Sequence, residues 1–282
     1  MDAANQALVN AFSIDVEDYF HVEALASAID RSRWDTLEYR AEANTRRVLD
    51  ILSQEKVRAT FFILGWVAKR SPQLVRDIHA AGHEVACHGL THQTVYTQTP
   101  DVFRAETREA KQRLEDATGV PVRGYRAATY SITARSLWAL DILEELGFRY
   151  DSSIFPIRHD LYGIPGSPRF AHRVASGALL EVPITTVEYM GQRLPAGGGG
   201  YFRLLPYALF RAAVRRVNAR DGQAAVFYCH PWEIDPGQPR VAGISAKSKF
   251  RHYTNLDRME GRLRHLLRDF RWGRMDEVFG VA

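Results

Sequence analysis

The chain has 282 residues, of which 46% are hydrophobic and 25% charged, a composition typical of a folded globular protein with a sizeable core. The formal net charge of +4 is small and spread along the chain. It suits an anionic glycan or an acidic membrane surface and does not indicate nucleic-acid binding. The two cysteines, Cys87 and Cys229, are too few for a disulfide framework or for a zinc site of their own.

Residues 1–10 lack the basic and apolar regions of a signal peptide. No apolar run approaches the roughly 18 residues that a membrane-spanning helix needs. We therefore expect a cytoplasmic protein with no transmembrane segment, and the sequence leaves open a peripheral contact with membrane machinery.

Short apolar segments alternate with amphipathic ones along the chain. Strands are predicted over residues 7–14, 57–64, 83–86, 122–125, 148–150, 179–183 and 224–229. Helices are predicted over residues 42–53, 72–81, 100–117, 133–146 and 205–220. This alternation favours a parallel α/β barrel or a doubly wound sheet.

Two segments of the second half carry their own signals. The glycine run 197–200 needs unusual backbone freedom and fits either a flexible groove rim or a simple surface loop. The basic tail, residues 247–274, has apolar residues at helical spacing and predicts a final amphipathic helix.

Ionisable residues follow five of the predicted strands: residues 15–18, residues 88–92, Arg126, Asp151 and His230. In α/β barrels the residues beyond the carboxyl ends of the strands share one face, and that face carries the chemistry. We therefore expect these groups to converge on one site.

Two histidines indicate a metal centre at that site. His88 and His92 are four residues apart, a spacing that on a helical turn places both imidazoles on one face. Two surface histidines would show the same spacing, so this pattern alone is weak evidence. The acidic cluster at another strand end favours the metal, because a catalytic zinc-type site needs three protein ligands and an open position.

The acidic cluster offers the third ligand and a general base. Asp15 and Glu17 point to the same face if the strand persists, whereas Asp18 lies on the other face or in the turn. One carboxylate would bind the metal and a second would accept a proton. The structural alternative is an acidic loop cap.

His230 ends the last predicted strand and precedes Pro231 and Trp232. It is either a packed structural residue or a proton donor tuned near neutral pH, and the other clusters favour the second interpretation. Cys87 and Cys229 each precede a candidate histidine, and we expect both to face away from the site.

Five ordered motifs resemble those of the polysaccharide deacetylase family, also called carbohydrate esterase family 4 or the NodB-homology domain. The motifs lie at residues 13–18, 82–84 with 88–92, 124–130, 151–153 and 228–231. The family includes chitin and peptidoglycan deacetylases and the rhizobial nodulation deacetylase. Residues 15–20, 198–203 and 230–233 further resemble a subgroup encoded with exosortase-linked (PEP-CTERM) exopolysaccharide loci.

The resemblance implies a distorted (β/α) barrel with a C-terminal helical extension. It implies one domain over residues 1–282, with a catalytic core at about 10–235 and a basic extension at about 236–282. The implied activity is metal-dependent hydrolysis of N-acetyl groups on a polysaccharide or glycan precursor, in contact with the machinery of exopolysaccharide synthesis. The implied cofactor is a divalent metal ion, zinc before cobalt, nickel or iron.

The same resemblance implies roles for single residues. Asp15 is the catalytic base, Arg126 holds it in place through a charge-assisted pair, and His230 protonates the leaving amine. A backbone N–H near Tyr130 helps to stabilise the oxyanion. The residues expected to bind substrate are Tyr130, Asp151, Tyr201 and Trp232. For Asp151 we also expect a supporting role, for the loop or for the pair of Arg126 and His230.

Two positions depart from the family pattern. Val16 replaces the second of two adjacent aspartates, so the metal carboxylate is Glu17 or Asp18, with Glu17 favoured by strand geometry. Ala128 replaces a proline that would stiffen the groove wall, which bears on the rigidity of the loop more than on the chemistry.

Two other functions fit the same pattern. One is a related barrel hydrolase that acts on a small amide, similar to allantoinase. The other is a catalytically inactive glycan-binding barrel that keeps the fold and has lost the metal.

Overall fold

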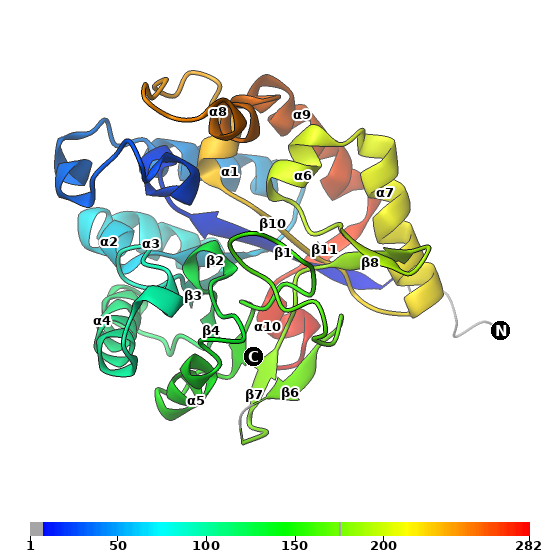
Figure 1. The fold of residues 1–282 in the computed structure, drawn as a ribbon, viewed down its shortest axis with the longest axis horizontal. Helices are drawn as coiled ribbons and strands as arrows, with labels where there is room; N and C mark the ends of the chain where they lie inside the picture. The colour runs from blue at the N-terminus through cyan, green and yellow to red at the C-terminus, as the bar shows by residue number, and fades with distance from the viewer. Residues whose placement is uncertain (1–7, 175) are drawn as a thin grey trace.

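The computed structural model describes residues 8–174 and 176–282, and Figure 1 shows the ribbon. Within these residues the main sheet has nine strands; eight follow the order β10-β1-β2-β3-β4-β5-β7-β6, and β11 pairs with β1. All pairs in this sheet are parallel except β6 with β7. Strands β8 and β9 form a separate antiparallel hairpin.

The strands are β1 (Val9–Val16), β2 (Thr60–Ile63), β3 (Glu84–Cys87), β4 (Gly124–Tyr125), β5 (Tyr150–Asp151), β6 (His172–Val174), β7 (Leu179–Glu181), β8 (Thr186–Tyr189), β9 (Gln192–Pro195), β10 (Val226–Cys229) and β11 (Arg271–Gly273). The helices are α1 (Ala41–Gln54), α2 (Gly65–Arg70), α3 (Pro72–Ala80), α4 (Pro100–Thr118), α5 (Trp138–Glu145), α6 (Gly199–Leu204), α7 (Tyr207–Arg216), α8 (Ala246–Tyr253), α9 (Leu256–Asp269) and α10 (Met275–Val278).

Alternation along β1 explains how the sheet separates packing from chemistry. Phe12 and Ile14 are fully buried in the larger core, which the outer helices cover. Ser13 and Asp15 point to the opposite side of the strand, into the barrel. Functional side chains can therefore lie inside the barrel while their neighbours on the strand pack against the helices.

The predicted barrel is confirmed, and every predicted strand is present with shifts of a few residues at its ends. The sequence patterns missed the short helix α2, the edge strand β6 and the β8–β9 hairpin. These elements are short and half exposed, so their apolar periodicity is weak. Residues 1–7 lie outside the described residues. They include Ala7, the first residue of the first predicted strand, and belong to the N-terminus expected to lack a signal peptide.

The glycine run is not a simple surface loop, because residues 197–199 are buried and Gly200 lines the pocket described below. Gly197 accepts a 2.7 Å hydrogen bond from the Tyr228 amide, and Gly198 forms a parallel bridge with Tyr228. A Cβ on Gly198, whose φ is +125°, would lie 2.0 Å from the Tyr228 carbonyl oxygen. The glycines therefore allow close backbone approach beside β10.

The basic tail was predicted from its periodicity to be one helix, and this prediction is wrong. It divides into α8 and α9, followed by strand β11 and helix α10. Asn255, with φ of +57°, separates the two longer helices. Residues 271–273 then join the sheet beside the first residues of β1.

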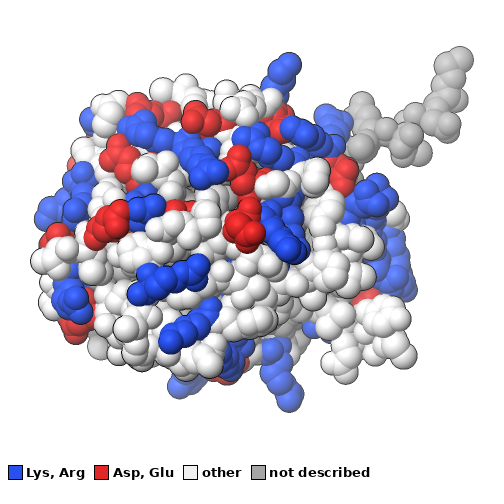
Figure 2. All heavy atoms as spheres, turned by 90° about the horizontal axis from the view of Figure 1, so that it is seen from above, with Lys and Arg blue, Asp and Glu red and all other residues white. Residues whose placement is uncertain are grey.

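No helix of the described residues has the length and apolar character to cross a bilayer. Figure 2 shows Lys and Arg side chains interspersed with Asp and Glu over the face seen from above. This mixture agrees with the spread of charge expected from the sequence.

Candidate active site

A pocket of about 400 Å³ contains most of the residues that the sequence motifs selected. The predicted residues that line it are Asp15, Glu17, His88, His92, Tyr130, Tyr201, His230 and Trp232. They come from the carboxyl ends of several strands and from α6, so the expected convergence on one face is present.

Three of these residues form a candidate metal centre. Glu17, His88 and His92 each offer one ligand atom, and these atoms lie within 4.8 Å of one another. All three side chains are buried. A set of two imidazoles and one carboxylate is one of the ligand sets of catalytic zinc sites, which keep another position open.

Hydrogen bonds orient these ligands. His88 Nδ1 lies 2.8 Å from the Arg126 carbonyl oxygen, so it carries the proton and leaves Nε2 as the ligand atom. Trp232 Nε1 donates a 3.0 Å hydrogen bond to Glu17 Oε1. Glu17 Oε2 lies 2.7 Å from His92 Nε2.

Asp18 does not join this group. Its carboxylate accepts hydrogen bonds from three backbone amides, those of Tyr19, Arg40 and Ala41. It caps the short helix that begins at Tyr19, which is the acidic loop cap named as the structural alternative. The structure therefore brings Glu17, and not Asp18, to the histidines.

The two histidines meet without the helical turn that their spacing suggested. The segment from His88 to His92 is a loop after β3, and Gly89 and His92 have φ of +78° and +54°. A sharp turn of the backbone, rather than helical periodicity, brings the imidazoles together.

The predicted pair between Asp15 and Arg126 is present. Arg126 Nη1 donates a 2.6 Å hydrogen bond to Asp15 Oδ1. The guanidinium is fully buried, lies 4.0 Å from the Phe62 ring centroid, and donates further to Ser13 and Ser152. Arg126 therefore fixes the carboxylate from beneath the pocket without lining it.

His230 belongs to a buried chain of charged groups. Its Nδ1 lies 2.8 Å from Glu233 Oε1, and Arg203 Nε donates to the other Glu233 oxygen. Its Nε2 faces the pocket, 4.0 Å from Asp15 Oδ2 and 3.6 Å from Glu17 Oε1. Glu233 thus orients the imidazole, and Arg203 holds Glu233.

Burial and charge set the protonation of these groups. Burial lowers the pKa of His88 to about 4, which keeps its imidazole neutral and able to bind a metal. Burial also acts to lower the pKa of His230, but the carboxylates of Glu17 and Glu233 outweigh it and raise the value to about 9. The pKa of Glu17 falls below its usual range because the charges of His92 and His230 outweigh the effect of burial.

The loop with Ala128 is held by hydrogen bonds in place of a proline. The Ala127 amide donates to Ser153 Oγ at 2.8 Å, and Ser131 Oγ donates to the Ala128 carbonyl at 2.6 Å. The Tyr130 amide, expected near the oxyanion, instead donates to the Ala127 carbonyl. Tyr130 Oη lies buried with no hydrogen-bond partner among the described residues, so its hydroxyl is the group this loop offers to a substrate.

Asp151 does not line the pocket, contrary to its expected contact with substrate. It is fully buried and accepts a hydrogen bond from Ser153 Oγ. Burial and the adjacent Asp151 carboxylate raise the pKa of Glu181 well above its usual range. Asp151 supports the loop that carries Ser153 and does not contact the pocket.

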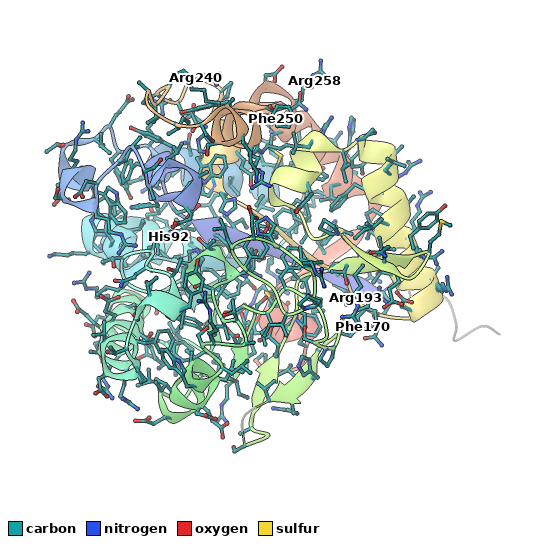
Figure 3. The ribbon with its side chains drawn as sticks, in the orientation of Figure 1. His92, Phe170, Arg193, Arg240, Phe250 and Arg258 are labelled. Atoms are coloured by element: carbon teal, nitrogen blue, oxygen red, sulfur yellow. The ribbon has the colours of Figure 1, made fainter. Side chains whose placement is uncertain are left out.

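The outer wall of the pocket comes from the second half of the chain. Tyr201 and Trp232 lie there as expected, together with residues that the sequence did not single out: Tyr162, Lys247, Phe250 and Arg251. In Figure 3, Phe250 lies on α8, above the level of His92. Arg203 and Glu233 were also missed, although both lie within segments that carried the subgroup resemblance.

Family comparisons divide the chain in two. Residues 30–150 match the polysaccharide deacetylase model. Residues 152–280 match a domain of unknown function, DUF3473.

Individual relatives match part of the sequence and all of the fold. A chitooligosaccharide deacetylase of Sinorhizobium fredii is 35% identical over 105 residues, which are 35% of this chain and 44% of that relative. A Mycobacterium smegmatis protein assigned to the polysaccharide deacetylases has a TM-score of 0.64 at 22% identity, covering 100% of this chain and 92% of its own. The PuuE allantoinase has a TM-score of 0.63 at 15% identity, covering 98% and 90%. The two structures bear on the fold alone.

Proposed function

We propose that the protein is a metal-dependent hydrolase that removes acetyl groups from N-acetylated amino sugars of a glycan. The observation that carries this proposal is the meeting of Glu17, His88 and His92 in one pocket with Asp15 and His230. A metal centre, a free carboxylate and an imidazole are the groups that amide hydrolysis needs.

The residues present fit a divalent cation. His88, His92 and Glu17 would hold it, since two of these groups already have partners that orient them, the Arg126 carbonyl and the Trp232 indole. When bound, such an ion supplies electrophilic activation of the acetyl carbonyl and of a water molecule.

The side chains of the chain account for the proton transfers. Asp15, held by Arg126, accepts the proton of the water that attacks the acetyl carbonyl carbon. As the C–N bond breaks, His230 gives its Nε2 proton to the leaving nitrogen, and Glu233 stabilises the imidazolium at Nδ1. The products are acetate and a free amino sugar, and Tyr130 Oη offers a hydrogen bond to the bound sugar.

The glycan that we propose is an exopolysaccharide or its precursor. Supporting this is the resemblance of residues 198–203 and 230–233 to the exosortase-linked subgroup. The aromatic side chains of the outer wall, Tyr162, Tyr201 and Phe250, are suited to sugar faces rather than to a small linear amide.

Acetate release from N-acetylchitotetraose tests the proposal. The purified protein is depleted of metal, reloaded with Zn²⁺ or Co²⁺, and assayed beside Asp15→Asn, His88→Ala and the control His265→Ala, an exposed histidine on α9. We expect the first two variants to lose at least about 100-fold in rate and the control to keep it. Equal activity in all four proteins, or hydrolysis of allantoin without action on the sugar, would reject the proposal.

A further inference from the structure

One wall of the pocket carries a cation, Arg251, that forms no ion pair with the residues that the structure describes. Three residues of α8 line the pocket, Lys247, Phe250 and Arg251, at the i, i+3 and i+4 spacing of one helix face. Phe250 lines the pocket and is 59% exposed, so its ring is accessible to a ligand.

The two cationic side chains of α8 that line the pocket, Lys247 and Arg251, differ in whether they form an ion pair. Lys247 Nζ lies 3.3 Å from Asp160 Oδ2, so its charge is shared with a carboxylate. No carboxylate of the described residues forms an ion pair with the Arg251 guanidinium, and no hydrogen bond of that group is present within them. Arg251 is therefore the unpaired cation at this edge of the pocket.

The Arg251 guanidinium shares this wall of the pocket with the aromatic residues Tyr162 and Tyr201. Burial raises the pKa of Tyr201, and the positive charge of Arg251 opposes that rise, which places the two side chains within electrostatic reach. On the same wall, the rings of His159 and Tyr162 stack at 3.8 Å. A cation beside stacked rings suits a ligand that combines a sugar ring, whose face can pack on an aromatic ring, with a negative charge.

The position of α8 is fixed relative to the candidate catalytic groups. Arg203 donates hydrogen bonds to the carbonyls of Arg251, His252 and Thr254, at 2.9, 3.1 and 2.7 Å. The same guanidinium pairs with Glu233, which holds His230. The rim therefore has a defined position relative to the proton donor.

We propose that Arg251, flanked by Phe250 and Tyr162, forms a subsite for an anionic group attached to the acetylated sugar, a carboxylate or a phosphate. The inference rests on the proposed function, because it assigns the substrate of that pocket a negative charge. On this proposal, residues 152–280, which match the domain of unknown function, contribute to the selection of the substrate.

Calorimetric binding tests the subsite without requiring catalysis. The probes are neutral N-acetylchitotetraose, a tetrasaccharide of alternating N-acetylglucosamine and glucuronic acid, and N-acetylglucosamine 1-phosphate, at low and high NaCl. The variants are Arg251→Gln, Arg251→Lys and the control Lys249→Gln. Lys249 is a lysine of the same helix that lines a different cavity.

We expect Arg251→Gln to weaken binding of one anionic probe about 10-fold and of the neutral probe less than about 2-fold. Arg251→Lys should recover part of the loss, because it keeps the charge and lacks the planar fork. Lys249→Gln should leave all three affinities unchanged. The probe that responds shows whether the carboxylate or the phosphate is recognised, and high NaCl should weaken that probe alone.

Two results would overturn the subsite: equal losses for the charged and neutral probes, or no preference of the wild type for either anion. Acetate release from the same probes separates this proposal from the proposed function. Anion-dependent binding without hydrolysis would support the proposed subsite and contradict the proposed deacetylase activity. Equal hydrolysis and equal binding of all probes would support the deacetylase activity and contradict the subsite.

Discussion

Trp232 Nε1 donates a 3.0 Å hydrogen bond to Glu17 Oε1, while the other oxygen of that carboxylate lies 2.7 Å from His92 Nε2. An aromatic residue expected from the sequence to contact substrate thus also orients a candidate metal ligand. The indole comes from the short helix after β10, so two distant parts of the chain build the metal centre together.

Trp232→Phe removes this hydrogen bond and keeps most of the ring. We expect Zn²⁺ affinity to fall at least about 10-fold, because groups that orient metal ligands typically contribute 10- to 100-fold. Calorimetric titration of the metal-free protein measures the change. Trp272→Phe is the control, since that indole donates to the Leu266 carbonyl in the core, and unchanged affinity in both variants would contradict the prediction.

Glu233→Gln keeps the shape of the side chain and removes the charge that holds His230. We expect kcat for acetate release to fall about 100-fold with KM within about 2-fold, because a proton donor acts in the transition state. Glu233→Asp keeps the charge on a shorter side chain, so its kcat should lie between those of the wild type and of Glu233→Gln. A rise in KM with unchanged kcat would instead assign Glu233 to substrate binding.

His83 makes stability depend on pH. Burial, aided by the positive charges of Arg274 and Arg58, lowers its pKa to about 4 from the usual value of 6.5. The unfolded chain takes up the proton below pH 6.5 and the folded protein only near pH 4, so stability is lost as pH falls through this window. The loss should be on the order of 3 kcal/mol at most.

Chemical denaturation between pH 4 and 7 measures this loss. His83→Gln offers an oxygen in place of Nδ1, the acceptor for the Ala59 amide, and does not titrate. Its free energy of unfolding should therefore vary less over the window than that of the wild type. Parallel profiles for the two proteins would show that other groups control acid stability.

Gly198→Ala should destabilise the protein by about 2–4 kcal/mol, through strain at a φ of +125° and contact with the Tyr228 carbonyl. Gly147→Ala separates the two effects, because Gly147 has φ of +81° but nothing within 4 Å of the added Cβ. We expect that control to lose only about 1 kcal/mol. Thermal unfolding of both variants provides the comparison.

Much of the barrel and of the inner pocket could be predicted because both follow from local patterns. Asp15, His88 and His230 each come directly after or at the end of an apolar strand, and parallel strands end on one face. The same local view could not decide that Glu17 turns to the histidines while Asp18 caps a helix, since that depends on the amides of Arg40 and Ala41.

The outer wall and the supporting charges depend on contacts between distant residues. Arg203 lies in a glycine-rich segment and meets Glu233 thirty positions later, where no periodicity links them. Likewise, the tail was predicted as one helix because its apolar spacing continues across Asn255, whose left-handed backbone conformation ends that regularity. The residues of α8 that line the pocket could therefore not be predicted from the apolar spacing.

Strands β1 and β10 are hydrogen-bonded neighbours, with Ile14 opposite Cys229, although they lie far apart in the sequence. The proposed water-activating carboxylate therefore belongs to the first strand, and the proposed amine-protonating imidazole directly follows β10. A fragment ending before Val226 would retain all three candidate cation ligands yet lack any means of releasing the amino product. Such a truncated molecule should bind Zn²⁺ if it folds, while remaining inert toward acetamides.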